Sequence, residues 1–126
     1  MSRKTKGINA ERELVHKLWA FGWSACRIAG SGSSHYPSPD VIAGKDCRSL
    51  AIECKTTKKT KYLTKEEVNN LVSFAKIFGA EPWIGIRFRE GWFFLKPKDL
   101  KDTGKGLAVS KELAKQKGLG LKKLLG

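Results

Sequence analysis

Cysteine is scarce in this sequence of 126 residues, and long hydrophobic runs are missing. The three cysteines, Cys26, Cys47 and Cys54, form no Cys-x-x-Cys pair, so they indicate neither a disulfide framework nor a structural zinc site. No apolar run approaches the roughly 20 residues that a membrane-spanning helix needs. The basic N-terminus is not followed by the apolar segment of a secretory signal. We therefore expect a cytoplasmic protein in a reducing compartment, with no membrane partner.

Acidic residues are also few in comparison with basic ones. Twelve Asp and Glu stand against 25 Lys and Arg, which gives a formal net charge of +13. Such a surplus on so short a chain creates a field that attracts polyanions. Nucleic acid is the leading candidate partner, and a membrane surface is the weaker alternative. The length suits one domain over residues 1–126, with one core and one functional site.

The apolar residues that are present recur at the spacings of two helices and five strands. Residues 9–21 follow a helical period, with Asn9 as the expected N-cap. Thr64 and Glu67 form a capping box that opens a second helix, which ends at Gly79. Five shorter runs bounded by turn residues predict strands, and they are residues 24–29, 40–44, 49–55, 82–88 and 92–95.

Three segments lack such a period. Residues 1–7 form a basic N-terminal arm, and residues 55–62 form a charged connection. Residues 97–126 form a Lys-rich tail with one possible short helix near residues 110–117. The order of the other elements is one helix, three strands, a second helix and two strands. This order favours an α/β or α+β fold in which helices pack against a sheet.

The stretch PDVIAGKDCRSLAIECK, residues 39–55, places a carboxylate at each end of a predicted hairpin. If Gly44 lies opposite Ser49, strand alternation puts Asp40 directly across from Glu53, with Cβ atoms about 4.5 to 5.5 Å apart. Two carboxylates this close repel each other, whereas a cation between them would make the arrangement favourable. Oxygen ligands of this kind, completed by water and phosphate oxygens, suit Mg²⁺.

Lys55 follows Glu53 by two residues and therefore lies on the same face of its strand. Its ammonium could orient a water nucleophile or balance negative charge on a phosphoryl oxygen. A metal ion, two carboxylates and a lysine together describe phosphodiester hydrolysis. The spacing is short and common, so solvated strand ends remain the alternative at this point.

Five runs of the sequence resemble one nuclease family. They are GINAEREL, CRIAGSGS, PDVIAG, AIECKTTK and FAKIFGAEPWIGIRF, and the likeness covers residues 3 to about 95. In this order they are similar to the archaeal-type Holliday junction resolvases, a branch of the PD-(D/E)xK nuclease superfamily. The resemblance implies a restriction-endonuclease-like α/β core with a mixed central sheet of about five strands flanked by helices. It also implies an endodeoxyribonuclease that depends on Mg²⁺, with Mn²⁺ as a substitute ion, and that resolves four-way DNA junctions by paired nicks.

The same resemblance implies roles for seven residues. A glutamate on the first helix, the Asp of PD, and the Glu and Lys of ExK form the family's active site, and they match Glu11, Asp40, Glu53 and Lys55. The three carboxylates are the implied metal ligands. An arginine beside the helix glutamate, an arginine in the first strand and a serine in the loop beyond it match Arg12, Arg27 and Ser31. Both arginines are expected to contact phosphates, and Ser31 is expected to belong to the catalytic site.

Each of these residues also has a simpler interpretation. Glu11 could be an acid favoured by the dipole of the first helical turn, and Arg12 and Arg27 could be ordinary surface cations. Further DNA contacts are expected from the basic arm and from the charged connection, namely from Arg3, Lys4, Lys6, Lys58, Lys59 and Lys61. A solvated loop is the alternative for the last three.

The second predicted helix carries more apolar residues than one sheet-facing stripe needs. Val68, Leu71, Val72 and Ala75 form that stripe, and Phe74, Ile77 and Phe78 widen it. We expect Phe74 and Phe78 in a homodimer interface, because a two-fold dimer would present two sites to the two strands of a junction. The resemblance points the same way, and a broader monomer core is the alternative.

Two rival functions stay open from the sequence alone. One is a PD-(D/E)xK nuclease for another branched or damaged DNA. The other is a non-catalytic nucleic-acid-binding module whose acidic residues are structural. Incubation of the protein with labelled junction and with plain duplex, each with Mg²⁺ or EDTA, distinguishes among the three.

Overall fold

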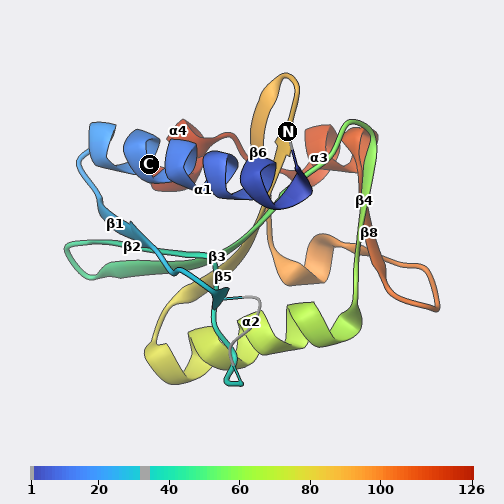
Figure 1. Cartoon of the computed structure of the whole chain (residues 1–126), viewed down its shortest axis with the longest axis horizontal. Helices are drawn as coiled ribbons and strands as arrows, with labels where there is room; N and C mark the ends of the chain where they lie inside the picture. The colour runs from blue at the N-terminus through green and yellow to red at the C-terminus, as the bar shows by residue number, and fades with distance from the viewer. Residues whose placement is uncertain (1, 32–34) are drawn as a thin grey trace.

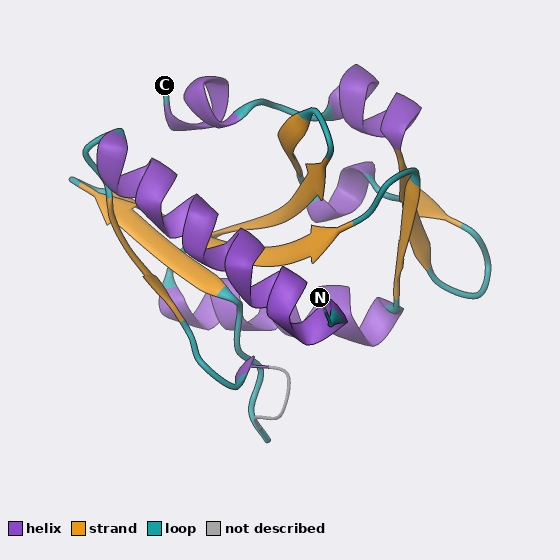
Figure 2. Ribbon diagram, turned by 45° about the horizontal axis from the view of Figure 1, so that its top comes forward, coloured by secondary structure: helices purple, strands orange, loops and turns teal. Residues whose placement is uncertain are grey.

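A five-stranded sheet forms the centre of the computed structural model, which describes residues 2–31 and 35–126 (Figure 1). The elements of this core are α1 (Arg3–Ala20), β1 (Ser24–Arg27), β2 (Val41–Lys45), β3 (Arg48–Thr56), α2 (Lys65–Phe78), β5 (Glu81–Phe88) and β6 (Gly91–Leu95). The strand order is β1-β2-β3-β5-β6, in which β3 and β5 run parallel and the other neighbours antiparallel. Helices α1 and α2 lie on opposite faces of the sheet (Figure 2). The predicted fold class is confirmed.

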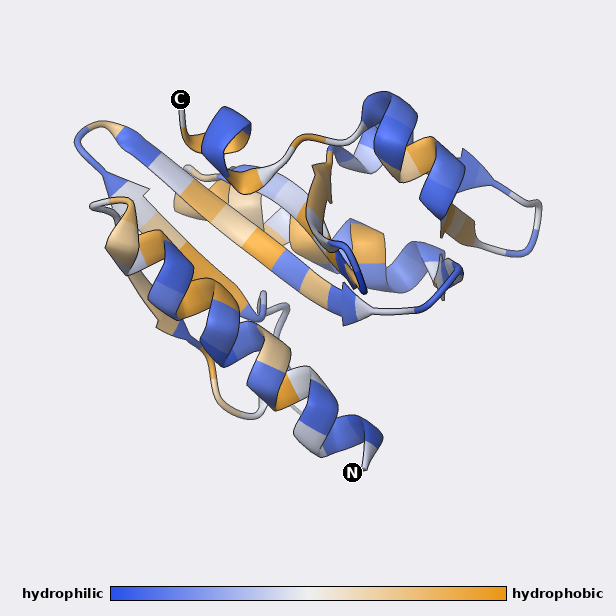
Figure 3. Ribbon diagram, turned by 90° about the horizontal axis from the view of Figure 1, so that it is seen from above, coloured by the Kyte–Doolittle hydropathy of each residue, from blue (hydrophilic) through white to orange (hydrophobic). Residues whose placement is uncertain are grey.

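Helix α1 begins at Arg3, where the Ser2 Oγ accepts the backbone N–H of Thr5 at 3.1 Å. The prediction of a separate arm over residues 1–7, followed by an N-cap at Asn9, is therefore wrong for the described residues. Residues 3–6 are exposed and hydrophilic, so they lack the apolar period on which that prediction depended (Figure 3). Further along, the helix buries the predicted stripe, which includes Ala10, Leu14 and Leu18.

The β2–β3 hairpin has the predicted register, with Gly44 opposite Ser49. Lys45 pairs with Arg48, so residues 46–47 form a two-residue turn. Asp40 precedes β2, and its backbone N–H donates to the Ile52 oxygen at 3.1 Å, which continues the pairing by one step. The hairpin therefore brings Asp40 to the position opposite Glu53.

Helix α2 also has the predicted ends. The Thr64 Oγ1 accepts the backbone N–H of Glu67 at 3.0 Å, and Gly79 adopts a left-handed conformation with φ of 87° at the C-cap. Val72 is 39% exposed, so its assignment to the sheet-facing stripe is wrong. The residues of the stripe that are buried are Val68, Leu71 and Ala75.

Each face of the sheet buries its own hydrophobic core. Ile52 packs on the α1 side, and its neighbour Ala51 packs on the α2 side, because side chains alternate along β3. Gly85 lets β5 approach the α1-side core closely, since a Cβ there would lie 3.0 Å from Phe94 Cε1. The same alternation places Glu53 and Lys55, which follow Ala51 at intervals of two residues, on the α2 side of β3.

The Lys-rich tail folds onto this core. It contains a 3₁₀-helix η2 (Pro97–Asp99), β7 (Lys101–Asp102), β8 (Leu107–Ser110), α3 (Lys111–Lys117) and α4 (Leu121–Leu125). A second sheet has the order β4-β8-β7, in which β4 is Thr60–Leu63. The predicted connection over residues 55–62 is therefore partly strand. Its pairing partner β8 is distant in sequence, so no local pattern predicted this pairing. The predicted helix near residues 110–117 is confirmed as α3.

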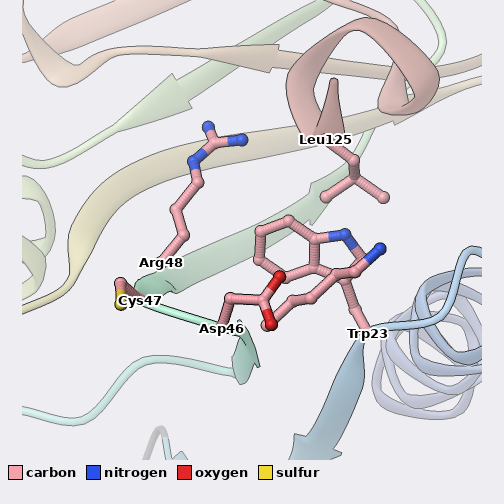
Figure 4. A pocket seen from close by; sticks show the side chains of 6 residues that line it. Trp23, Asp46, Cys47, Arg48 and Leu125 are labelled. Atoms are coloured by element: carbon pink, nitrogen blue, oxygen red, sulfur yellow. The ribbon is translucent and has the colours of Figure 1, made fainter.

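Arg48 in β3 joins the end of the tail to the sheet. It forms a two-point ion pair with Glu81, at 2.7 and 3.0 Å, and its Nη1 donates to the Leu124 oxygen at 2.7 Å. Its guanidinium carbon lies 5.6 Å from the ring centre of Trp23. Figure 4 shows Arg48 and Trp23 where they line a pocket of about 370 Å³ together with Leu125. No helix in the described part of the chain is long and apolar enough to cross a membrane.

Candidate active site

Asp40 is held in a defined orientation by two hydrogen bonds. Its Oδ2 accepts the backbone N–H of Cys54 at 2.8 Å, and its Oδ1 accepts the hydroxyl of Ser31 at 2.6 Å. Among the described residues it is the one polar or charged residue that is buried, with 8% of its surface exposed. A buried carboxylate needs such partners, and here they fix its direction. The structure thus brings the predicted Ser31 to the predicted Asp40.

Glu53 on β3 lies close to Asp40, as the hairpin register requires. Burial raises the pKa of Glu53 to about 8, and the negative charge of Asp40 adds to the effect. The ammonium of Lys55 opposes this change only in part. A hydrogen bond between Glu53 and Asp40 also raises this pKa, so two negative charges at this position are disfavoured. The cost of two facing negative charges is the relationship that the sequence predicted.

Helix α1 brings Glu11 to the same region. Arg27, the last residue of β1, lies with its Nη1 3.4 Å from Glu11 Oε1. Burial and the charge of Asp40 raise the pKa of Glu11, and Arg27 opposes that change. Arg12, the next residue along α1, is exposed. Three distant segments of the chain therefore contribute charged groups to one place.

Lys55 points from β3 toward two carboxylates. Its Nζ lies 3.7 Å from Glu53 Oε2 and 2.8 Å from Glu67 Oε2 of helix α2. Burial lowers the pKa of Lys55, but the contact with Glu67 and the nearby carboxylates outweigh burial and leave it raised. Lys55 is therefore a charged ammonium group whose position is restrained by the neighbouring carboxylates.

The carboxylates suit a divalent cation in their chemistry. Over residues 2–31 and 35–126, no three His, Cys, Asp or Glu side chains lie close enough to form a metal site by themselves. Mg²⁺, however, is commonly bound by one or two carboxylates, with water and phosphate oxygens completing its shell. The facing pair of Asp40 and Glu53, in which two negative charges are disfavoured without a cation, fits that description, and Glu11 lies close enough for the charge of Asp40 to raise its pKa.

The other predicted DNA contacts lie in two segments. Arg3, Lys4, Lys6 and Arg12 are exposed on α1, and Lys58 and Lys59 are exposed in the turn between β3 and β4. Lys61 is half-buried in β4. Their contacts with DNA stay a prediction.

The predicted interface residues lie on α2. The rings of Phe74 and Phe78 stack with their centroids 5.2 Å apart. Phe78 is 54% exposed and its neighbour Ile77 is 90% exposed, whereas Phe74 packs partly against the α2-side core. An apolar face is therefore exposed on this helix, and its role in a homodimer stays a prediction.

Glu67 is the site residue that sequence reasoning missed. The capping box correctly predicts that its backbone N–H binds the Thr64 hydroxyl, but that motif says nothing of Lys55. The available signal was an acidic residue in the first turn of the helix that follows the Glu-x-Lys strand. That signal is weak, because acidic residues are common in first turns.

The comparison with known proteins decides the family. The family model described as archaeal Holliday junction resolvase (Hjc) matches residues 2–126. The chain belongs to this resolvase family. The predicted resemblance is confirmed, and the matched region includes the tail that the sequence motifs left out.

Curated relatives and a solved structure agree with the family match. The crossover junction endodeoxyribonuclease Hjc of Archaeoglobus fulgidus is 40% identical over 112 residues, which cover 87% of this chain and 82% of that protein. The crossover junction endodeoxyribonuclease Hje of Saccharolobus solfataricus is 42% identical over 101 residues, which cover 76% and 75%. The structure of Archaeoglobus fulgidus Hjc, described as a Holliday junction resolvase, matches with a TM-score of 0.89 at 36% identity. That match covers 95% of this chain and 100% of the other.

Proposed function

We propose that this protein is a structure-selective endodeoxyribonuclease that resolves four-way DNA junctions by paired, Mg²⁺-dependent phosphodiester hydrolysis. One observation carries the proposal, namely that Asp40, Glu53 and Lys55 converge at the end of one hairpin. Two carboxylates and an ammonium are the groups that such hydrolysis uses. Membership of the resolvase family and the names of the relatives support the substrate class.

Asp40 and Glu53 are the residues that would hold Mg²⁺, with Glu11 as a direct or water-mediated ligand. When bound, the ion polarises the scissile phosphate and makes a bound water a stronger nucleophile at neutral pH. The ordered position of Asp40, set by Ser31 and the Cys54 backbone, prepares this side of the site.

The basic side chains of the site handle the phosphate. Lys55 orients the attacking water and balances charge on a phosphoryl oxygen. Arg27, held beside Glu11, and the exposed Arg12 grip neighbouring phosphates, because a guanidinium can contact a phosphate at two points. The DNA path continues over the lysines of the β3–β4 turn.

The working form is a homodimer. A four-way junction offers two strands of equal polarity related by approximate two-fold symmetry, and one site addresses only one strand at a time. The exposed apolar face of α2, around Ile77 and Phe78, supports a two-fold contact between copies. Such a dimer would present one site to each strand.

Cleavage of a labelled four-way junction tests the proposal. We expect paired nicks with Mg²⁺ or Mn²⁺, no nicks with EDTA, and little cutting of a duplex of the same sequence. Asp40→Asn and Glu53→Gln should abolish cleavage while junction binding persists, because neither removes positive charge from the binding surface. Equal cutting of the duplex would overturn the substrate assignment. A folded variant that cuts at nearly the wild-type rate would overturn the metal assignment.

A further inference from the structure

Glu67 reaches the candidate active site from helix α2. Its Oε2 lies 2.8 Å from the Nζ of Lys55, whereas the Oε2 of Glu53 lies 3.7 Å from the same nitrogen. Glu67 is therefore the nearer counter-ion of the two. The motifs of the sequence give it no role in the chemistry.

The contact between Glu67 and Lys55 is partly shielded from water. The side chain of Lys55 is 24% exposed and that of Glu67 is 36% exposed, but the Oε2 atom of Glu67 is itself buried. Among the described residues this oxygen has no donor aligned for a full hydrogen bond, so an ion pair at close range is what holds it. Separation would leave a buried carboxylate oxygen without a partner, which carries a free-energy cost.

The two partners differ in stiffness. Lys55 extends its ammonium on a flexible four-carbon stem. Glu67 stands on the first turn of a helix that Thr64 caps and that buries Val68 and Leu71. The helix therefore supplies a rigid point that limits where the ammonium can move.

We propose that Glu67 is a positioning residue for hydrolysis, which holds the ammonium of Lys55 at the place where it meets water and phosphate. The inference rests on the proposed function, because it assigns Glu67 a task only through Lys55. Glu67 touches neither the reacting phosphate nor the cation in this scheme. Positioning of this kind has large effects, since a displacement of about 1 Å at a reacting group can cost about 100-fold in rate.

Glu66 offers a matched control. It stands beside Glu67 in the same first turn of α2, contributes the same charge to the helix N-terminus, and is exposed. Glu66→Gln and Glu67→Gln therefore change the helix dipole and the net charge alike, but only the second removes the ion pair with Lys55.

The first experiment measures the contact itself, without DNA or metal. The folded proteins are treated with limiting acetic anhydride, and acetylation of Lys55 is followed by mass spectrometry. We expect Lys55 to be acetylated several-fold faster in Glu67→Gln than in wild type, with Glu66→Gln like wild type. Equal acetylation in the two variants would overturn the proposal. If Glu67→Gln fails to fold, Glu67→Asp replaces it, because Asp keeps the negative charge but its shorter side chain moves that charge away from Lys55. Lys55 should then be acetylated faster in Glu67→Asp than in Glu66→Gln, and equal rates would overturn the proposal.

The second experiment measures catalysis with Mg²⁺ and a labelled four-way junction. At saturating enzyme we expect Glu67→Gln to lower the single-turnover rate by about 10- to 100-fold, with junction affinity equal to or higher than that of wild type. Glu67→Asp should be intermediate, and Glu66→Gln should match wild type. A Glu67→Gln rate equal to that of Glu66→Gln would overturn the inference. Failure of the wild type to cut would instead overturn the proposed function, and the acetylation result would still judge the contact.

Discussion

Arg87 of β5 donates its Nε–H to Glu13 of α1 at 2.8 Å, and this contact joins residues 74 positions apart in the sequence. Trp92 of β6 donates its indole N–H to the same oxygen at 2.7 Å. Glu13 follows Glu11 by two residues on the helix. The contact therefore anchors α1 to the far strands of the sheet, near the segment that carries Glu11 to the candidate site.

Loss of the Glu13 charge should weaken the fold in a pH-dependent way. Burial raises the pKa of Glu13, but hydrogen bonds from Trp92 and Arg87 outweigh burial and leave it below its ordinary value of 4.5. The stability it contributes is therefore present above that ordinary value and is lost as pH falls through the lowered one. We expect Glu13→Gln to reduce the free energy of unfolding by about 1 kcal/mol near neutral pH and by less in acid.

Denaturant unfolding at neutral and acidic pH measures this difference. Glu66→Gln, which removes an exposed carboxylate from α2, serves as the control and should change little. A Glu13→Gln difference that stayed constant into acid would contradict the assigned cause.

Replacement of Glu53 by Gln should stabilise the metal-free protein at alkaline pH. The folded-state pKa of Glu53 is raised to about 8, above its ordinary value of 4.5. A raised carboxyl pKa means that stability is fully present below the ordinary value and is lost as pH rises through the folded one. Gln keeps the neutral form at every pH. In EDTA we therefore expect Glu53→Gln to exceed wild type by on the order of 2 kcal/mol above about pH 8.

The Glu53 experiment contains its own control, because the two proteins should converge below the ordinary carboxyl pKa. Thermal unfolding across the pH range in EDTA measures both limits. A wild type as stable as Glu53→Gln at alkaline pH would show that burial and the charge of Asp40 do not disfavour the ionised form of Glu53 as described.

Salt dependence of junction binding tests the DNA path over the β3–β4 segment. For duplex DNA the logarithm of the binding constant falls by about 0.9 per phosphate contact for each logarithmic unit of salt. If Lys58, Lys59 and Lys61 contact phosphates, replacing all three by Ala should reduce this slope by about 2 to 3. Titrations of labelled junction with EDTA at several salt concentrations give the slope.

The matched control for the lysine variant removes the same charge elsewhere. Lys76 of α2 and Lys122 and Lys123 of α4 are exposed, and their triple replacement by Ala should leave most of the slope unchanged. Equal slopes for the two triple variants would place the DNA path elsewhere.

Polar replacement on α2 should separate the proposed dimer. We expect Phe74→Gln combined with Phe78→Gln to yield a folded monomer that loses paired nicking, because the substitutions remove apolar surface from the contact. Phe78→Gln alone is the cleaner variant, since Phe78 is 54% exposed whereas Phe74 packs partly against the core. Light scattering with and without junction measures the mass.

An exposed aromatic residue elsewhere provides the control for the dimer. Phe21, at the end of α1, is 44% exposed, and Phe21→Gln should leave the oligomeric state unchanged. A wild type that is monomeric at working concentration, with and without junction, would contradict the dimer.

The hairpin at the centre of the candidate site follows from local sequence patterns alone. Side chains alternate along a strand with a period of two, so one register follows from the apolar residues that must share a face. That register already placed Asp40 opposite Glu53 and Lys55 on the same face as Glu53. The cap of α2 at Thr64 was equally local, and the structure confirms both.

The groups from other elements that meet this hairpin depend instead on how the helices and strands pack in three dimensions. The contact of Glu67 with Lys55 depends on how α2 docks on the sheet, and the contact of Glu13 with Arg87 depends on the position of α1. The pairing of β4 with β8 joins segments that are distant in the chain. A local pattern reports which face of an element is apolar, but it does not report which polar side chains two docked elements bring together, because that depends on the packing of the whole core.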